Sequence, residues 1–303
     1  MSKICTAMKQ PASDGFIIVA VLWILAALSA FVSIYAVYVV NTAAGLSVYD
    51  DRLRSQQLAS AAVELLAHRA LSQPTRPSTG HFEFRLGSGA AAVEFASEAG
   101  RIDLNAAPKE LLANLFAMLG ARMEPAQFYA ERIIAWRSAS SAQGTNPEAE
   151  AYRAEKRGYG PRAAAFPHPL ELSLVRGLPA DLVERALPFV TVYSGRAQVN
   201  VAAAAPEVLA ALPEMTPARV QAVMAQRQLR TSDRQTLLEL MGPARTHATL
   251  EPGRSFRATI KTNLNNGFRE RFETVVLVFE EGRDPLAVLS WRRQDDDLGP
   301  DTP

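Results

Sequence analysis

The stretch DGFIIV, residues 14–19, leads into a run of uncharged residues that continues to Tyr49. Within this run, residues 16–40 are almost wholly apolar. An α-helix rises about 1.5 Å per residue, so a segment of this length can cross a bilayer. The sequence therefore predicts a transmembrane helix over residues 16–40.

A glycine stands directly before the apolar segment, whereas an ordinary secretory signal is cut after its apolar stretch, behind small residues. A short polar leader ending in Gly15 resembles a type IV prepilin signal. That resemblance implies removal of residues 1–15 by a prepilin peptidase, which cuts after Gly15 and N-methylates Phe16. An uncleaved single-pass anchor and a secretory peptide cut near residues 27–29 are the alternatives.

The composition excludes several classes of protein. The net charge of the 303 residues is +1, which gives no electrostatic footprint for nucleic acid over the whole chain. The only cysteine is Cys5, in the leader, so disulfides have no role in the mature chain. Lys3 and Lys9 in the leader favour a cytoplasmic N-terminus.

Helical periodicity continues beyond the membrane segment and stops at Pro74. Alternation of apolar and polar residues then predicts strands in two sets, separated by a long stretch of mostly helical pattern. The predicted strands lie near residues 82–86, 93–95, 256–260, 273–279 and 285–291. The economical interpretation is an α+β fold in which one antiparallel sheet packs on the N-terminal helix and a helical domain is inserted between its strands.

The expected boundaries follow from these patterns. They are 1–15 for the leader, 16–73 for the N-terminal helix, 74–101 and 251–292 for the two parts of the sheet, 102–250 for the inserted helical domain, and 293–303 for a disordered tail.

The insert contains an internal repeat. Residues 102–112 (IDLNAAPKELL) align without gaps with residues 199–209 (VNVAAAAPEVL). Each copy leads into a second helix, so the repeat units lie near residues 102–137 and 199–227. We expect Asn105 to cap the first helix of the first copy.

These repeats are similar to helix-hairpin-helix modules, some of which bind the DNA backbone through glycine amides. The turn of the second copy, residues 212–217, contains Glu214 and no glycine. A carboxylate there would repel phosphate. We therefore expect a structural or protein-docking role, with nucleic-acid binding as the alternative.

The order and spacing of these motifs are similar to those of the minor pseudopilin K of type II secretion systems, the GspK family. The resemblance covers nearly the whole chain. It rests on the Gly15-Phe16 junction, the two repeats, the segment Tyr159-x6-Phe166 with the Glu171-Leu172 pair after it, and residues 187–192 (LPFVTV). It implies a type IV pilin-like fold with a large helical insert.

The resemblance also implies a function. The chain would be a non-enzymatic minor pseudopilin at the tip of the secretion pseudopilus, initiating or capping filament assembly for export of folded proteins across the outer membrane. It would span the inner membrane once, with its N-terminus in the cytoplasm and its main domain in the periplasm. The alternatives are a membrane-anchored periplasmic adaptor and a helix-hairpin-helix-type nucleic-acid-binding protein.

The implied partners are the I and J minor pseudopilins, the prepilin peptidase and the inner-membrane assembly platform, with no nucleic acid. We expect the I and J members to pack on the exposed half of the long helix. Small residues there, such as Ala59, Ala61 and Ala62, would permit close helix approach.

Most type IV pilins carry a glutamate at the fifth residue after the cut, where this chain has Ala20. A carboxylate in hydrocarbon is costly unless it is paired, and the pilin glutamate pairs with the terminal amine of a neighbouring subunit. A subunit without it cannot recruit a predecessor in this way, although its own Phe16 amine can still be received. Ala20 therefore fits a tip position, or it is simply an alanine that suits a membrane.

Members of the family often carry an Asp-rich calcium loop after the second helix of the first repeat. The corresponding residues 136–140 contain no carboxylate, and we interpret the nearby Glu148, Glu150 and Glu155 as a solvated loop. Calcium prefers six to eight oxygen ligands. We therefore predict no cofactor and no metal, with calcium as the alternative that the family resemblance implies. The four histidines lack metal-ligand spacing, and the chain has no P-loop or nucleophile elbow, so no catalytic residue is predicted.

Overall fold

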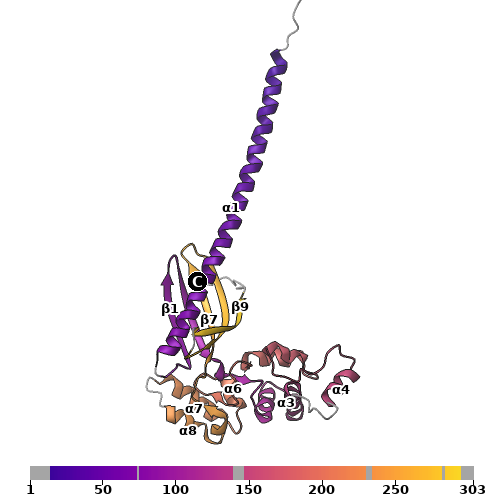
Figure 1. Cartoon of the computed structure of the whole chain (residues 1–303), viewed down its shortest axis with the longest axis vertical. Helices are drawn as coiled ribbons and strands as arrows, with labels where there is room; N and C mark the ends of the chain where they lie inside the picture. The colour runs from indigo at the N-terminus through magenta and orange to yellow at the C-terminus, as the bar shows by residue number, and fades with distance from the viewer. Residues whose placement is uncertain (1–13, 74, 139–146, 230–233, 282–283, 295–303) are drawn as a thin grey trace, which may run out of the picture. The chain divides into compact units, whose positions relative to one another are not determined.

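The computed structural model describes residues 14–73, 75–138, 147–229, 234–281 and 284–294. The chain divides into two compact units, Met1–Gln56 and Gln57–Pro303. Helix α1, Asp14–Ser72, contributes to both units (Figure 1). Most of the predicted leader (1–13) and most of the predicted tail (295–303) lie outside the described residues.

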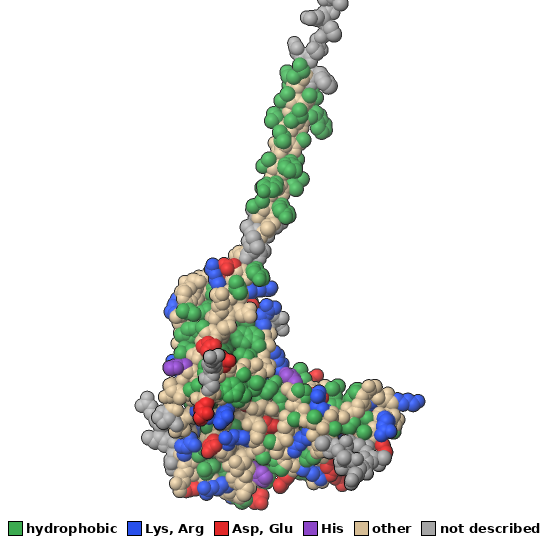
Figure 2. Space-filling model, in the orientation of Figure 1, with side chains coloured by type: hydrophobic (Ala, Val, Ile, Leu, Met, Phe, Trp, Pro, Cys, Tyr) green, Lys and Arg blue, Asp and Glu red, His purple; other side chains and the backbone are tan. Residues whose placement is uncertain are grey.

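The first unit holds the apolar part of α1. The segment Ile17–Val39 is 23 residues long and is uncovered by the rest of the described chain. Its large apolar side chains are exposed along the whole segment, as the green surface of the helix in Figure 2 shows. In water such a surface would be strongly unfavourable. By length and composition this segment can cross a membrane once.

The second unit contains one five-stranded antiparallel sheet in the order β1-β2-β7-β8-β9. Its strands are β1 Thr79–Leu86, β2 Gly89–Ser97, β7 Ser255–Leu264, β8 Arg269–Val278 and β9 Leu286–Gln294. Two strands precede the helical insert and three follow it, which confirms the predicted α+β class. The expected disordered tail is wrong at its start, because Arg293 and Gln294 pair with β8.

The last turns of α1 bury one face against this sheet. The buried stripe has helical spacing and consists of Leu58, Ala59, Ala62, Val63, Leu66, Ala67 and Ala70. The sheet contributes to the same core a row of register partners, Phe82, Val93, Ile260 and Phe272. Burying a large apolar side chain contributes about 1.5–3 kcal/mol, so this face fixes the helix on the sheet.

The helical insert lies between β2 and β7 and is built from two repeat units, which are parts of the second compact unit of the chain. The first comprises β3 Ile102–Asp103, α2 Lys109–Met118, α3 Met123–Arg137, α4 Pro147–Ala154, the 3-10 helix η2 Pro169–Leu174, α5 Ala180–Ala186, η3 Leu187–Phe189 and β4 Val190–Thr191. The second comprises β5 Val199–Asn200, α6 Pro206–Ala211, α7 Pro217–Gln228, α8 Arg234–Leu240, η4 Gly242–His247 and β6 Ala248–Thr249.

Each unit is closed by a short parallel strand pair, β3 with β4 and β5 with β6. Both units therefore begin with a two-residue strand, continue through a helical hairpin, and end with a helix, a 3-10 turn and the partner strand. The repeat units are longer than predicted: they extend to Thr191 and Thr249 and do not end at 137 and 227.

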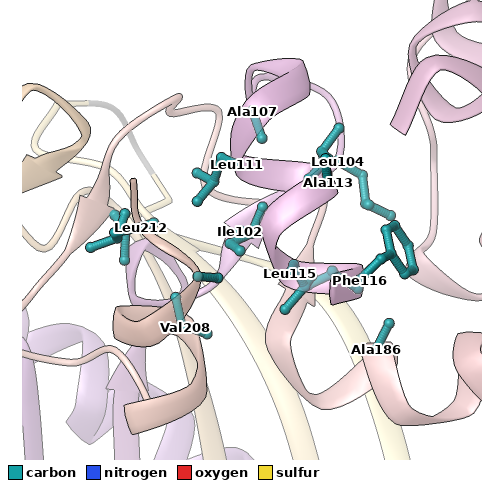
Figure 3. Close-up of a cluster of buried hydrophobic side chains, with 14 of the residues drawn as sticks. Ile102, Leu104, Ala107, Leu111, Ala113, Leu115, Phe116, Ala186, Val208 and Leu212 are labelled. Atoms are coloured by element: carbon teal, nitrogen blue, oxygen red, sulfur yellow. The ribbon is translucent and has the colours of Figure 1, made fainter. Parts of the chain in front are cut away.

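The two repeat units of the insert share one apolar core. Ile102 and Leu111 of the first unit lie between its own Leu115 and the second unit's Val208 and Leu212 (Figure 3). All five are buried, and helices α2 and α6 pack directly on one another. The first helices of the two repeats therefore form the centre of the insert.

An arginine at the end of each second helix fixes the repeated turn. Arg137 donates hydrogen bonds to the carbonyl oxygens of Leu104 and, at 2.9 Å, Ala107. Arg227 donates to the equivalent carbonyls of Val201 and, at 2.7 Å, Ala204. Burial lowers the pKa of Arg227 to about 10, so it stays charged at neutral pH. Each guanidinium thus satisfies two backbone acceptors of the turn that would otherwise lack partners.

The predicted cap at Asn105 is wrong. The first helix of the repeat is preceded by Pro108, which makes no side-chain cap, and Asn105 lies in the turn before it. Its Oδ1 accepts from the Phe166 amide at 2.7 Å, and its Nδ2 donates to the Phe166 carbonyl at 3.0 Å. Asn105 therefore holds a distant loop to the turn, because Asp103 already accepts the local amide bond that defines the turn.

A buried carboxylate joins the insert to the sheet. Glu98, in the 3-10 turn η1 (Glu98–Gly100), has no exposed surface. Arg257 of β7 donates to it at 2.7 Å, and Thr191 of β4 donates a second hydrogen bond. Arg257 also binds Glu273 of β8 at 2.7 Å. Burial alone would lower the pKa of Arg257, but the two carboxylates outweigh it and raise that pKa above its ordinary value.

Further hydrogen bonds complete this joint. Asn200 donates to the Ser78 hydroxyl at 2.9 Å, and Ser255 donates to the Tyr193 carbonyl at 2.7 Å. Ser78 lies between the end of α1 and the start of β1, whereas the opposite end of the β1–β2 hairpin contacts Leu58 through Gly89. The insert is therefore attached at the end of the sheet where α1 finishes.

Gly100→Ala should destabilise the protein by about 1–3 kcal/mol, because overpacking against fixed backbone is costly. A Cβ at position 100 would lie 2.8 Å from the carbonyl carbon of Ala203, whose amide is held by Asn200. Chemical denaturation measures the change. Gly158→Ala, where a new Cβ meets nothing within 4 Å, is the matched control. Equal stabilities of the two variants would contradict the close packing at Gly100.

His168 should make stability depend on pH. Its Nδ1 accepts a hydrogen bond from the Leu170 amide at 3.1 Å, which requires the neutral ring. Burial, then Arg292 and Arg257, lower its pKa below the ordinary value of 6.5. The unfolded chain therefore takes up this proton first, and the free energy of unfolding falls as pH drops below about 6.5 through the lower folded pKa.

Thermal unfolding between about pH 7.5 and 5 measures this effect. His168→Asn keeps a capping oxygen without a titrating group, so it should lose less stability on acidification than the parent. His81→Asn, at an exposed histidine, is the control and should follow the parent. A parallel pH profile for His168→Asn would count against the role of this histidine.

Candidate membrane anchor and interaction surfaces

The residues predicted for processing lie together at the start of one helix. The helix α1 begins at Asp14, so Gly15, Phe16 and Ala20 all have helical backbone. Ala20 is half-exposed and belongs to the apolar segment Ile17–Val39. Cleavage after Gly15, methylation of Phe16 and the tip role of Ala20 stay predictions.

The exposed face of α1 in the second unit differs from the one expected. Ala59 and Ala62 have no exposed surface, because they pack on this chain's own sheet. Of the three predicted alanines only Ala61 is half-exposed, so the expectation that Ala59 and Ala62 face a partner is wrong. The outward residues are polar and include Glu64 and His68. Small residues alone do not reveal which of two helix faces they serve.

The backbone amides of the two helical-hairpin turns donate hydrogen bonds within the turns themselves. In the first repeat Gly120 has a left-handed φ of 99°, and its amide donates to the Ala117 carbonyl at 3.0 Å. In the second repeat Glu214 adopts the left-handed conformation, with φ of 56°, and the Met215 amide donates to the Leu212 carbonyl at 3.2 Å. A DNA-binding hairpin offers such amides to phosphate. Here they close the helix ends, which supports a structural role.

Of the three glutamates interpreted as a solvated loop, Glu148 is buried, which contradicts that interpretation, whereas Glu150 and Glu155 are exposed. Glu148 lies on α4, is 6% exposed and forms an ion pair with Arg132. Glu155 pairs with Arg176 at 2.7 Å, and Glu150 is exposed. Within the described ranges, no group of three or more His, Cys, Asp or Glu side chains is placed to hold a metal ion. Sequence reasoning missed the ion pairs because their arginines come from distant elements.

Comparison with known families matches residues 92–195 to the family described as type II secretion system (T2SS), protein K. The matched segment runs from β2 through the first repeat unit to the strand β4 that closes it. No match is found among curated proteins.

Among solved structures, the chain is similar to a chain of the crystal structure of the GspK-GspI-GspJ complex from the type 2 secretion system of enterotoxigenic Escherichia coli. The TM-score is 0.57 at 19% sequence identity, and the similarity covers 84% of this chain and 99% of that one. At this identity the match shows a shared fold. Residues 92–195 therefore match the protein K family of type II secretion systems, and the chain has a pilin-like α+β fold; together these findings confirm the resemblance predicted from its sequence.

Proposed function

We propose that this chain is a minor pseudopilin that occupies the tip of a type II secretion pseudopilus, where it initiates or caps the filament. The observation that carries the proposal is the position of the insert. It is attached through Glu98 and Asn200 at the end of the sheet where α1 finishes. In a filament of packed α1 helices, a subunit stacked beyond that end would meet the helical insert.

Ala20 supports the same position. A glutamate at this depth would be stabilised only by an amine from another subunit, since an unpaired charge in hydrocarbon costs a few kcal/mol on insertion scales. A first subunit has no predecessor to supply that amine. Alanine removes the penalty and leaves the chain's own terminus available to the next subunit.

The partners we propose are the I and J minor pseudopilins, since the matched fold comes from a GspK-GspI-GspJ complex. Their docking surface would be the outward face of α1, which carries Gln57, Glu64 and His68 beside Ala61. The prepilin peptidase would cut after Gly15, and the inner-membrane assembly platform would be a further partner. The protein would be anchored in the inner membrane with its sheet and insert in the periplasm, and it would have no enzymatic activity of its own.

A periplasmic adaptor outside any filament is the competing function, and nucleic-acid binding is another. The first would not need the I and J proteins, and the second would give salt-sensitive DNA binding in a filter assay. The hydrogen-bonded hairpin amides and Glu214 favour protein partners over DNA.

A fragment of residues 46–303 should form a discrete complex with the periplasmic parts of the I and J proteins at concentrations up to tens of micromolar, about the weak end for a modest interface. Size-exclusion chromatography with light scattering would detect it. Glu64→Arg should weaken assembly about tenfold or more, because it places a bulky reversed charge within the proposed contact. Glu184→Arg, at an exposed glutamate of the insert, is the matched control. Failure to form any ternary complex would contradict tip assembly.

Coexpression with a prepilin peptidase should shorten the full chain to a product that begins with N-methyl-Phe16. Glycine has no Cβ, so Gly15 suits a tight protease subsite that Gly15→Val would block. Intact-mass spectrometry distinguishes the cut, methylated and uncut forms. Ala12→Val, a similar substitution at another leader position, should still be processed. Efficient cleavage of Gly15→Val would show that the prepilin interpretation is incorrect.

A further inference from the structure

The connection between α3 and α4 is where the family resemblance would place a calcium ion. Residues 138–146, which form this connection, contain no aspartate and no glutamate. Calcium sites in proteins are built from several oxygen ligands, usually including carboxylates. The donor set of the connection therefore does not fit this ion.

The buried carboxylate that follows this connection in the sequence, that of Glu148, already pairs with arginines. Glu148 forms an ion pair with Arg132 of α3, and its other oxygen lies 3.6 Å from Nε of Arg176. The Glu148 side chain is 7% exposed, so water screens these pairs only weakly. Arg132 also stacks over the Phe128 ring at 4.4 Å, which holds its guanidinium toward Glu148.

A second glutamate extends the cluster. Glu155 pairs with Arg176 at 2.7 Å and with Arg157 at 2.8 Å. The cluster thus contains three guanidinium groups and two carboxylates, which gives a net charge of 3 − 2 = +1. A divalent cation brought to either carboxylate would be repelled by the arginines that already neutralise it.

The same ion pairs hold α4 to the rest of the first repeat unit. One turn after Glu148, Tyr152 is buried, accepts a hydrogen bond from the Arg176 amide at 2.6 Å and donates to the Leu174 carbonyl at 3.2 Å. Its ring lies 5.8 Å from that of Trp136 at the end of α3. Residues four apart share one helix face, so Glu148 and Tyr152 fix α4 to α3 and to the turn after η2 together.

We infer that the ion pairs of Glu148 with Arg132 and Arg176 hold α4 to α3 and to the turn after η2 in place of a metal ion, so that the insert folds independently of calcium. The carboxylate of Glu148, paired with guanidinium groups on both sides, fixes the first turn of α4. The inference concerns the folding of the insert and does not depend on the proposed tip role.

The first experiment uses the full chain in detergent. Thermal unfolding followed by tryptophan fluorescence, to which Trp136 contributes, is measured with millimolar calcium chloride and with a chelator. We expect the same midpoint in both conditions. A midpoint that rises with calcium, together with stoichiometric calcium binding in isothermal titration, would overturn the inference.

The second experiment compares Glu148, which forms the ion pairs, with an exposed glutamate on the same helix. Glu148→Gln should lower the midpoint by about 5 °C or more, because it leaves the partly buried Arg132 without its counter-charge. Glu150→Gln, at an exposed glutamate on the same helix, should leave the midpoint unchanged. Equal midpoints for the two variants would refute the role of Glu148.

A double variant keeps the test decisive if Glu148→Gln folds poorly. The double variant Arg132→Met with Glu148→Met removes both charges of the pair together. Its midpoint should fall by less than the sum of the decreases measured for Arg132→Met alone and Glu148→Met alone. Additive losses would show that the two side chains do not act as a pair, and the inference would fall.

Discussion

The buried carboxylate of Glu98 joins the helical insert to the sheet, and the hydrogen bonds of Asn200 with Ser78 and of Ser255 with Tyr193 strengthen the same attachment. Taking a charged group out of water costs several kcal/mol, so it persists only where its partners are fixed. The hydrogen-bond partners come from the sheet and from the insert: Arg257 of β7 and Thr191 of the strand that closes the first repeat, while Glu273 of β8 binds the same Arg257. Removing Arg257 would leave the buried Glu98 carboxylate without its nearest counter-charge. The orientation of the insert on the sheet is therefore set by electrostatics and hydrogen bonding as much as by apolar contact.

Much of the sheet could be predicted because its residues alternate. Phe82, Val93 and Ile260 point to one face and their neighbours to the other, and a period of two is visible in a sequence. The four strands inside the insert were missed, since an element of two residues such as β3 has no period to detect. Their existence depends on the partner strands β4 and β6, which lie far along the chain.

The side chains that were misjudged share a different cause. Asn105, Glu148 and Ala59 each have chemistry that suits two environments. Asn105 suits a helix end or a loop contact, and Glu148 suits solvent or an ion pair. Ala59 suits a contact with a partner or with the chain's own sheet. Which environment applies is decided by residues that contact them only in the folded state, such as Phe166 and Arg132. The residues predicted for processing, Gly15 and Phe16, are a different case: the prediction concerns recognition by another protein, the prepilin peptidase, so the fold of this chain does not test it.

The placement of the insert between two paired strands also has a consequence for the order of folding. The last residue of β2, Ser97, is the register partner of Phe256, yet the whole insert separates them along the chain. Closing so long a loop in an unstructured chain costs conformational entropy that the strand pair alone repays poorly. Once the insert has folded, its two ends are already neighbours and the effective loop is short. Folding of the insert before β7, β8 and β9 pair with the β1–β2 hairpin would therefore lower the entropic cost of closing the sheet. Until those strands join, the core beside α1 lacks the side chains that β7 and β8 supply, so a substitution that unfolds the insert would also leave part of the apolar stripe of α1 exposed.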